Sequence, residues 1–367
     1  MRLEQLLLYN FRNIERTELH PHHLFNIFYG DNAQGKTNLL ESISLLGSLK
    51  SFRLSRNDEL IKNNESYSEI KGETEKNGVK HQIKLRIDKE NKKAWLDGKR
   101  INRPEAYLDC LRPVVFAPEE VNLIKGPPSG RRRLLDRAVF QTDNKYLADV
   151  QKYDRQLKQR NRLLKEKRPE NELAPWTDEL AKTGAAIRHA RSRYIEKILP
   201  QVKDCYLHIC GQQEQVNLFC KADTKDISEL EQNLLDEFER QKEQEKRYGV
   251  TLSGPHRDDI DFLLDQRPLK SYGSQGQQRS FILAFKVAQA LHLKEVYGEP
   301  PLLLFDDLTG ELDRHRQNLF FEFLLSLKAQ VFITTTEVQP LLDGGIRDGY
   351  FIRVEQGVFT TTVSDEV

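Results

Sequence analysis

The chain has little of what marks a secreted or a zinc-binding protein. Only four of its 367 residues are cysteine, and no two of them form a CxxC pair. This usage indicates reduced, mostly buried thiols rather than disulfides or a zinc site. The nine histidines add no metal-ligand spacing, because His20, His22 and His23 flank a proline in what we expect to be a solvated turn.

Long apolar runs are also missing. No stretch reaches the roughly 18 apolar residues that a membrane-spanning helix needs. The apolar run at residues 6–8 is too short for a signal peptide and has acidic and arginine flanks. We therefore expect a cytoplasmic protein that has no membrane partner.

The charges nearly cancel over the whole chain but not locally. The formal net charge is +1, so no global positive field indicates nucleic acid. Residues 125–197, however, carry 19 Lys and Arg against 10 Asp and Glu, a local net charge of +9. Residues 221–247 carry 6 against 9, a net charge of −3. Positive charge is therefore concentrated in one middle segment.

Hydrophobic periodicity predicts strands and helices of an α/β fold, with an antiparallel β lobe and an inserted set of helices. Strands are expected at 3–9, 24–29, 113–118, 251–264, 301–306 and 331–335, with hairpin strands between 67 and 96 around the turn Asn77-Gly78. Helices are expected at 38–46, 131–159, 176–199, 227–247 and 280–296. The helices at 131–159 and 176–199 should lie antiparallel, separated by the Pro- and Glu-rich stretch 167–175.

The most specific motif is the octapeptide GDNAQGKT, which fits the phosphate-binding loop pattern G-x-x-x-x-G-K-[ST] between an expected strand and helix. Backbone N–H groups of such a loop and the N-terminus of the following helix bind phosphate. Lys36 should reach the β- and γ-phosphates, and the Thr37 hydroxyl should bind Mg²⁺. The expected nucleotide-binding residues are Gly30, Asp31, Asn32, Ala33, Gln34, Gly35, Lys36, Thr37 and Asn38.

The expected acidic partner of this loop comes 270 residues after Lys36, where the apolar run 302–305 ends in Asp306 and Asp307. Asp306 should hold the water shell of Mg²⁺, and Asp307 should orient a hydrolytic water. The two halves of the nucleotide site therefore require that the N- and C-terminal parts of the chain fold into one ATPase core.

A third motif, SQGQQRS at residues 274–280, opens an expected helix before the acidic strand. It resembles the LSGGQ-type signature of ABC ATPases, in which a helix N-terminus of one subunit caps the γ-phosphate held by the other. By that resemblance Ser274, Gly276 and Gln277 contact ATP in a partner subunit, with the serine hydroxyl and the glycine amide donating to phosphate oxygens. The segment 311–313 falls where these ATPases place the D-loop.

Together the motifs resemble those of the bacterial RecF recombination-mediator family across nearly the whole chain. They are FRN at 11–13, GDNAQGKTNLLE at 30–41, KSFR at 50–53, FAPEE at 116–120, RRRLLD at 131–136, QRN at 159–161, GPHRDD at 254–259, SQGQQRS, LLLFDD at 302–307 and FITTTE at 332–337. The resemblance implies an SMC-like ABC-type ATPase head, with a mixed sheet and an antiparallel β lobe, at residues 1–120 and 248–367. A shortened helical arm is inserted at 121–247.

The same resemblance implies the activity. Members of the family dimerise head to head around two ATP molecules, with Mg²⁺, and bind double-stranded, gapped or junction DNA in that state. They assist RecO and RecR in loading the strand-exchange recombinase, in DNA repair and at replication forks, and are associated with the nucleoid. ATP hydrolysis is weak, is stimulated by DNA and serves as a conformational switch.

Several positions depart from related ABC enzymes. Asp307 stands where those enzymes usually have glutamate, which indicates a slow switch rather than a fast motor. Thr336 stands at the position of the switch histidine, where it can position a water but cannot accept a proton near neutral pH. Glu119 or Glu120 substitutes for the missing Q-loop glutamine, and Gly310 stands where the family more often has serine. The expected catalytic residues are Lys36, Asp307 and Thr336.

Five arginines are candidate DNA contacts. Lys and Arg neutralise phosphates without reading the sequence, and the chain has no base-reading motif. Arg53 and Arg257 could equally form structural salt bridges, and the run at 131–133 could equally be the solvated start of a helix. The candidates are Arg53, Arg131, Arg132, Arg133 and Arg257.

Two other functions are compatible with the nucleotide motifs. A transporter ATPase subunit shares them, but its insertion between loop and signature is shorter than the 236 residues between Thr37 and Ser274. A non-catalytic, nucleotide-bound DNA scaffold is the other alternative, because Asp307 and Thr336 are weak catalytic groups. The scaffold predicts no ATP turnover even when DNA is present.

Overall fold

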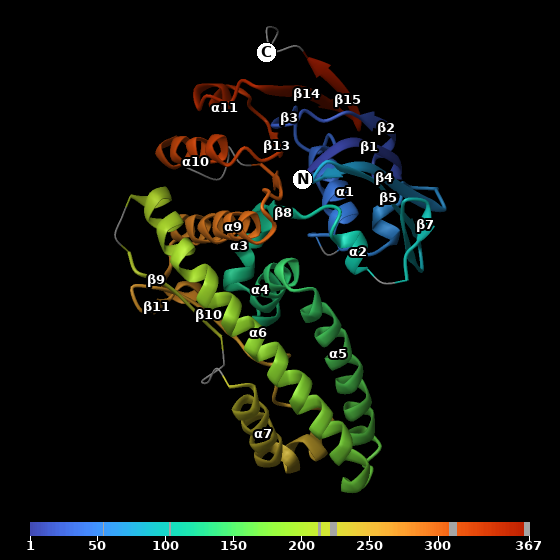
Figure 1. The fold of residues 1–367 in the computed structure, drawn as a ribbon, viewed down its shortest axis with the longest axis vertical. Helices are drawn as coiled ribbons and strands as arrows, with labels where there is room; N and C mark the ends of the chain where they lie inside the picture. Colours follow the sequence, from blue (N-terminus) through green and yellow to red (C-terminus); the bar gives the residue numbers. More distant parts are fainter. Residues whose placement is uncertain (54, 103, 212–213, 221–225, 308–313, 363–367) are drawn as a thin grey trace. The chain divides into compact units, whose positions relative to one another are not determined.

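The computed structural model describes residues 1–362 except 54, 103, 212–213, 221–225 and 308–313 (Figure 1). The chain forms two compact units. The first unit comprises Met1–Val121, His208–Gly211 and Arg279–Val367, and the second unit comprises Asn122–Leu207 and Gln212–Gln278. The segment 248–278, which we expected in the ATPase head, therefore lies in the second unit. The reason is that β10 (Ile260–Leu264) pairs there with β9 (Val216–Cys220).

The first unit contains a six-stranded sheet with the order β15-β14-β3-β13-β12-β8. Its strands from β14 to β8 are parallel neighbours, and β15 runs antiparallel to β14. The central strands are mostly apolar and almost completely buried, as a parallel sheet with two covered faces requires. The predicted mixed sheet is confirmed. Its strands are β3 (Phe25–Tyr29), β8 (Pro113–Phe116), β12 (Leu302–Phe305), β13 (Val331–Thr335), β14 (Gly349–Glu355) and β15 (Val358–Thr362).

Helix α1 (Lys36–Ser48) contacts both this sheet and an antiparallel sheet of order β2-β1-β4-β5-β6-β7. Leu39, Ile43 and Leu46 of α1 are fully buried in the core between the two sheets. Gly72 permits the close approach, because a Cβ there would lie 2.6 Å from Leu46 Cδ2. The predicted antiparallel lobe is thus confirmed, with three strands in addition to the three within residues 67–96. Its strands are β1 (Arg2–Phe11), β2 (Ile14–Leu19), β4 (Tyr67–Lys76), β5 (Val79–Asp88), β6 (Lys92–Leu96) and β7 (Lys99–Arg100).

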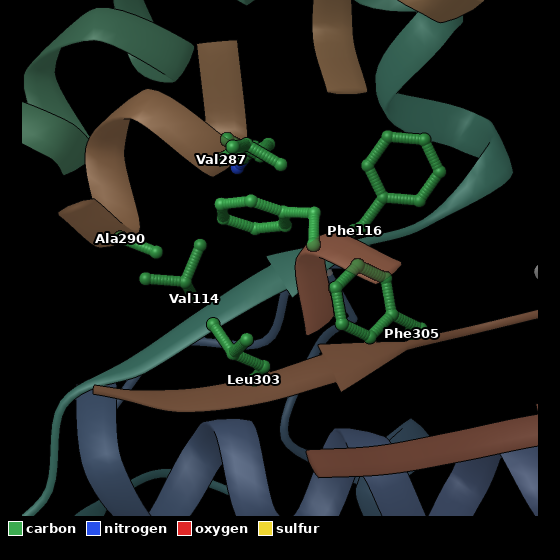
Figure 2. A pocket seen from close by; sticks show the side chains of 8 residues that line it. Val114, Phe116, Val287, Ala290, Leu303 and Phe305 are labelled. Atoms are coloured by element: carbon green, nitrogen blue, oxygen red, sulfur yellow. The ribbon is translucent and has the colours of Figure 1, made fainter. Parts of the chain in front are cut away.

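Helices α9 (Gln275–Tyr297) and α10 (Arg314–Leu327) pack on the other face of the parallel sheet. In Figure 2, Val287 and Ala290 of α9 face Val114 of β8 and Leu303 of β12. The cavity between them has a volume of about 10 Å³, at most the room of one water molecule. This layer is therefore packed core.

The first unit also contains the short helices α2 (Glu105–Leu108) and α11 (Gln339–Asp343). Helix α3 (Pro118–Lys125) begins in the first unit and ends in the second.

The second unit is mainly helical. The helix expected at 131–159 is two helices, α4 (Pro128–Thr142) and α5 (Asn144–Lys165), because the Asp143 carboxylate accepts hydrogen bonds from the first N–H groups of α5 and caps it. Helix α6 (Glu170–Cys210) is longer than predicted and includes two prolines. α5 and α6 run side by side in Figure 1. The remaining elements are α7 (Ile227–Tyr248), α8 (Leu269–Tyr272) and a three-stranded sheet of order β11 (Arg267–Pro268), β10 and β9.

Buried arginines join the helices of the second unit. Arg188 of α6 donates through Nε to Asp258 Oδ2 at 2.8 Å and through Nη2 to Glu237 Oε2 of α7 at 3.1 Å. Arg191 of α6 donates to Asp136 of α4, and Arg160 of α5 donates to Glu245 of α7. These arginines are at most 5% exposed. Directional ion pairs rather than apolar contacts alone therefore fix the helices relative to one another.

All four cysteines are free thiols, two of them buried and two half-buried. Within the described residues, no helix combines the length and apolar character needed to cross a membrane.

Candidate nucleotide-binding site

The loop between β3 and α1 adopts a conformation that needs glycine at both ends. φ is +141° at Gly30 and +114° at Gly35, values that L side chains rarely adopt. Space also demands glycine, since a Cβ at Gly30 would lie 2.6 Å from the carbonyl oxygen of Val354. The loop leads directly into the N-terminus of the 13-residue helix α1, and this arrangement stabilises a bound anion.

Lys36 is the first residue of α1 and lies over the loop. Its ammonium group donates to the carbonyl oxygens of Gly30 at 2.6 Å and Asp31 at 2.7 Å. Burial lowers the pKa of Lys36, and the negative charges of Asp307 and Asp306 oppose this shift. The lysine and the two aspartates that the motifs indicated are thus close enough to act on one another electrostatically.

Asp306, at the end of β12, is the centre of a hydrogen-bonded cluster. Its Oδ1 accepts from Thr37 Oγ1 at 2.8 Å and from Thr334 Oγ1 at 2.6 Å. The Asp306 side chain is buried, and this burial raises its pKa. β12 and β3 flank β13, so the ends of these three strands bring together residues that are far apart in the sequence. Thr334 was not predicted, and its only signal was its place at the end of a neighbouring parallel strand.

The donor set at Thr37 and Asp306 suits Mg²⁺. A hydroxyl and a carboxylate oxygen are hard ligands, and Mg²⁺ keeps waters and phosphate oxygens for the rest of its octahedron. Among the residues that the structure describes, no group of three His, Cys, Asp or Glu side chains could hold a metal ion. An ion at this site would therefore depend on nucleotide phosphates and water for most of its ligands.

Asp307 and Thr336 lie at the ends of adjacent parallel strands, β12 and β13. Both are exposed. Asp307 has a left-handed backbone conformation, with φ of +49°, and its N–H donates to Thr334 Oγ1 at 3.0 Å. Aspartate tolerates this conformation better than most residues. The two predicted catalytic residues thus lie at the same edge of the sheet, and their side chains are accessible.

The two candidates for the Q-loop position have different environments. Glu120 is 3% exposed and forms a 3.0 Å ion pair with Lys286 of α9, so it has a structural role. Glu119 is exposed, and its charge is one of the causes that raise the pKa of Asp306. Of these two glutamates, Glu119 is therefore the one that influences the Asp306 carboxylate electrostatically.

The loop and helix α1 are held from both ends of the chain. Asn13 Nδ2 donates to the carbonyl oxygen of Gln34 at 3.1 Å, and Asn13 Oδ1 accepts from Asn38 Nδ2 at 2.8 Å. From the β14–β15 turn, the Gly357 N–H donates to the same Gln34 carbonyl at 2.8 Å, and the Gln356 N–H donates to Gln34 Oε1 at 2.7 Å. Sequence reasoning assigned no role to Asn13, Gln356 or Gly357.

A buried carboxylate on α1 organises the segment after the helix. Glu41 is fully buried and accepts from Arg12 Nε at 2.5 Å and from the hydroxyls of Ser51 and Ser55. Arg53, a candidate DNA contact, donates to Asn38 Oδ1 at 3.2 Å and has its Nη1 3.9 Å from Glu41. Arg53 therefore lies beside the first turns of α1.

The predicted signature loop belongs to the second unit, where it begins α9. The Ser274 hydroxyl accepts from the Gln277 N–H at 3.1 Å, while Gln277 Oε1 accepts from the Ser274 N–H at 2.8 Å. This reciprocal pair is a capping box. Gln277 Nε2 also donates to Glu214 Oε1 at 2.7 Å. Ser274 remains exposed, and Gly276 is half-buried.

The structure separates the other arginine candidates. Arg131 is 3% exposed and makes four hydrogen bonds, two to the Asp259 carboxylate and two to backbone carbonyls. It is therefore a structural residue, because a phosphate could bind it only by breaking these bonds. Arg132 is half-buried and donates to the Asp258 carbonyl at 2.6 Å. Arg133 is half-buried and Arg257 is exposed. Gly310 and the D-loop expected at 311–313 lie outside the described residues.

Comparisons with known proteins agree with the site. A model of the RecF/RecN/SMC N-terminal domain matches residues 2–351. "DNA replication and repair protein RecF" of Syntrophotalea carbinolica is 47% identical over 97% of this chain and 98% of its own length. The protein of the same name from Geotalea uraniireducens is 43% identical over 97% of this chain and 99% of its own length.

Solved structures show the same similarity. A structure of the recombination mediator protein RecF-ATP in the RecFOR pathway has a TM-score of 0.89 at 29% identity and covers 98% of this chain and 99% of its own. An SMC head bound to a domain of ScpA has a TM-score of 0.58 at 16% identity, over 99% of this chain and 97% of its own, and supports the fold alone. The resemblance inferred from the motifs is confirmed: the chain belongs to the RecF family of DNA replication and repair proteins, which are ABC-type ATPases.

Proposed function

We propose that the chain is an ATP-gated DNA clamp of recombinational repair. ATP binding joins two copies head to head on double-stranded or gapped DNA, and slow hydrolysis releases them. In the cytoplasm, at the nucleoid, the clamp assists RecO and RecR in loading the strand-exchange recombinase. The family membership supports this proposal, as does the RecFOR pathway named for the related ATP-bound structure.

The ATPase part of the proposal rests on one observation: the hydroxyls of Thr37 and Thr334 both donate hydrogen bonds to the carboxylate of Asp306. It joins the phosphate loop to the acidic strand at one point. When bound, ATP with Mg²⁺ supplies a γ-phosphoryl group for transfer to water. Thr37 and Asp306 would hold the ion, and the Lys36 ammonium, which donates to the carbonyls of Gly30 and Asp31 here, would bind phosphate oxygens.

The environment of Ser274 supports the dimer. Its hydroxyl and the first N–H groups of the 23-residue helix α9 form an exposed helix N-terminus, which favours negative charge. The capping box with Gln277 orders this turn in advance, so little conformational entropy is lost when it meets an anion. In the proposed dimer, Ser274, Gly276 and Gln277 of one copy contact the γ-phosphate held by the other.

Slow turnover follows from the residues at the edge of the sheet. Asp307 has a shorter reach than glutamate, and Thr336 is not a base near neutral pH. Glu119 and Asp307 both raise the pKa of Asp306 through their negative charges, and Glu119 would help to order the ion's water shell. These features favour a switch over a motor.

The test of the dimer is the mass in solution measured by light scattering with and without ATP, together with binding of a gapped duplex. Wild type should dimerise with ATP and bind the duplex. Lys36→Met should fail to dimerise because it holds phosphate weakly, and Ser274→Arg should fail because the added side chain blocks the contact with the other copy. Ser271→Arg adds the same charge at an exposed position of α8 and should behave like wild type. A Ser274→Arg chain that dimerises and binds DNA normally contradicts the composite site.

The non-catalytic scaffold is separated from this proposal by ATP turnover. Turnover should be slow and should rise when duplex is added, and Asp307→Asn should lower it at least tenfold because the hydrolytic water loses its orienting carboxylate. Absence of turnover in wild type with DNA present would favour the scaffold.

A further inference from the structure

The solvent face of the antiparallel sheet carries two aligned rows of mostly basic side chains. Residues directly opposite on adjacent antiparallel strands point to the same face. The inner face, with Leu6, Leu8 and Ile70, is buried. On the outer face the register aligns Arg16, Tyr9, Glu69, Arg86 and Lys93 in one row. The second row is Glu18, Leu7, Lys71, Lys84, Trp95 and Arg100.

These two rows, here called the basic rows, hold six basic and two acidic side chains, a net charge of +4. Glu69 lies 2.9 Å from Lys71 Nζ and 4.0 Å from Lys84 Nζ, and Lys93 lies 3.7 Å from Asp88 beside the rows. Arg16 and Arg100 are exposed. Exposed ion pairs are weak, so these partners reduce the positive potential of the rows without cancelling it.

Aromatic rings lie beneath two of the cations. Lys84 Nζ is 4.4 Å from the centroid of the Trp95 ring, and Arg86 Cζ is 3.8 Å from that of Tyr67. Such cation–π contacts restrict long side chains at the surface. Cations that are already restricted lose less conformational entropy when they bind an anion.

The charge of this face changes sign along the strands. Beyond the basic rows, the next positions of β4 are Glu73 and Glu75, and Lys80 is paired with Glu73 at 3.0 Å. The positive charge is therefore confined to one half of the face. This half is the only part of the sheet face whose charge favours a polyanion among the strand residues that the structure describes.

We propose that the basic rows bind the phosphate backbone of duplex DNA, an inference that rests on the proposed DNA-binding function and names its surface. Adjacent strands are about 4.8 Å apart, so a row across six strands extends on the order of 24 Å. A duplex presents one charge per ~1.7 Å of axis, and this length matches about seven base pairs. Charged residues, lysine above all, are depleted in the cores of protein–protein interfaces, so the six cations of the rows favour phosphates over a protein partner.

The test is a triple variant, Lys84→Gln, Arg86→Gln and Arg100→Gln, compared with a control triple, Lys80→Gln, Arg347→Gln and Arg353→Gln. Both change the net charge equally at exposed or half-buried positions of the first unit. With ATP, the first variant should bind duplex at least tenfold more weakly, and its slope of log affinity against log salt should fall by about 2.7, whereas the control should keep the wild-type slope. Both should retain ATP-dependent dimers and DNA-independent turnover.

A fluorescence experiment locates the contact independently. The chain has two tryptophans, so Trp176→Phe leaves Trp95 as the only reporter. Duplex should change the Trp95 emission, and the change should saturate with the same Kd as binding measured by anisotropy. An emission that stays constant while the chain becomes saturated with DNA places the duplex elsewhere.

The outcomes separate this inference from the proposed function. A wild-type chain that binds no duplex with ATP contradicts the proposed function. A chain that binds duplex, with a triple variant whose affinity and salt slope equal those of the control, contradicts only the surface assigned here. Normal duplex binding by the triple variant together with lost binding of a partner protein would assign the basic rows to that partner instead.

Discussion

The cores of the two units are built from different interactions. In the first unit, the strands β3, β8, β12 and β13 and helix α1 bury mainly aliphatic and aromatic side chains. In the second unit, Arg131, Arg160, Arg188 and Arg191 are buried against carboxylates from other segments. Hydrophobic burial is not directional, whereas an arginine fork fixes both distance and orientation.

The two units therefore position their functional segments in different ways. The predicted nucleotide-binding residues at the ends of β3, β12 and β13 take their positions from a parallel sheet, so their placement follows from the regular order of the strands. The loop at residues 254–259 has no regular structure of this kind, and side chains hold it instead: Arg188 binds Asp258, Arg131 binds Asp259 and Tyr153 binds His256. The second unit should accordingly depend more on charge and pH.

Removal of one buried arginine should have the largest effect on stability. Arg188→Ala leaves Asp258 and Glu237 buried without their cation, and we expect a loss of about 3–5 kcal/mol in the free energy of unfolding, measured by urea denaturation. Arg257→Ala, an exposed neighbour in the same loop, should change it by less than about 0.5 kcal/mol. Equal, small effects of both changes would show that the second unit does not depend on its ion pairs.

The matching change in the first unit creates a cavity. Leu304 of β12 is fully buried, and Leu304→Ala should cost about 3 kcal/mol through lost burial and an unfilled cavity. Val358→Ala, at a residue that is 64% exposed, serves as the control and should be nearly neutral. The loss for Leu304→Ala should not depend on salt. If this loss depended strongly on salt, the core of the first unit would rely on charge as the core of the second unit does.

A pH series tests how far the second unit depends on the charge of its side chains. Burial lowers the pKa of His256 to about 4, and Tyr153 Oη lies 2.7 Å from its Nδ1. Because the unfolded chain takes up this proton at higher pH, the stabilisation from neutral His256 is present above about pH 6.5 and is lost as the pH falls towards 4. The stability of wild type relative to His256→Gln should fall by about 2 kcal/mol between pH 7 and 4.5. A constant difference between the two chains would contradict the assignment.

The smallest expected effect concerns Thr334. Thr334→Val removes the hydroxyl that donates to Asp306 and accepts from the Asp307 N–H, so ATP turnover should fall about tenfold and the Mg²⁺ concentration for half-maximal turnover should rise. Thr334→Ser keeps the hydroxyl and should restore most of both values. If valine and serine gave the same activity, the hydroxyl would have no role in positioning the aspartate.

Contiguous motifs allowed the sequence to predict much of the site. The phosphate loop is local, so its pattern specifies its glycines, its lysine and the helix that follows. The acidic end of the apolar strand indicated that Asp306 serves the same Mg²⁺ site as Thr37, and the structure joins the two residues by a hydrogen bond. Thr334 could not be found in this way, because its role depends on the order of strands in the sheet and not on any local pattern.

The sequence also could not predict which charged residues are buried. The three arginines at 131–133 are identical in sequence, yet Arg131 is buried on Asp259 while Arg133 is not, and only helical phase within the folded unit distinguishes them. The segment 248–278 joined the second unit for a related reason. Its strand β10 pairs with β9, and such a partner is chosen by long-range packing.

The contact between the β14–β15 turn and Gln34 has a consequence for synthesis of the protein. Gly357 and Gln356 bind a loop that a ribosome would have released more than 300 residues earlier, and β3 has β13 and β14 as its neighbours. A nascent chain carries the complete phosphate-loop motif long before it has the strands that support it. We therefore expect truncated translation products to hold no nucleotide, so that unfinished copies could not enter a dimer and block it.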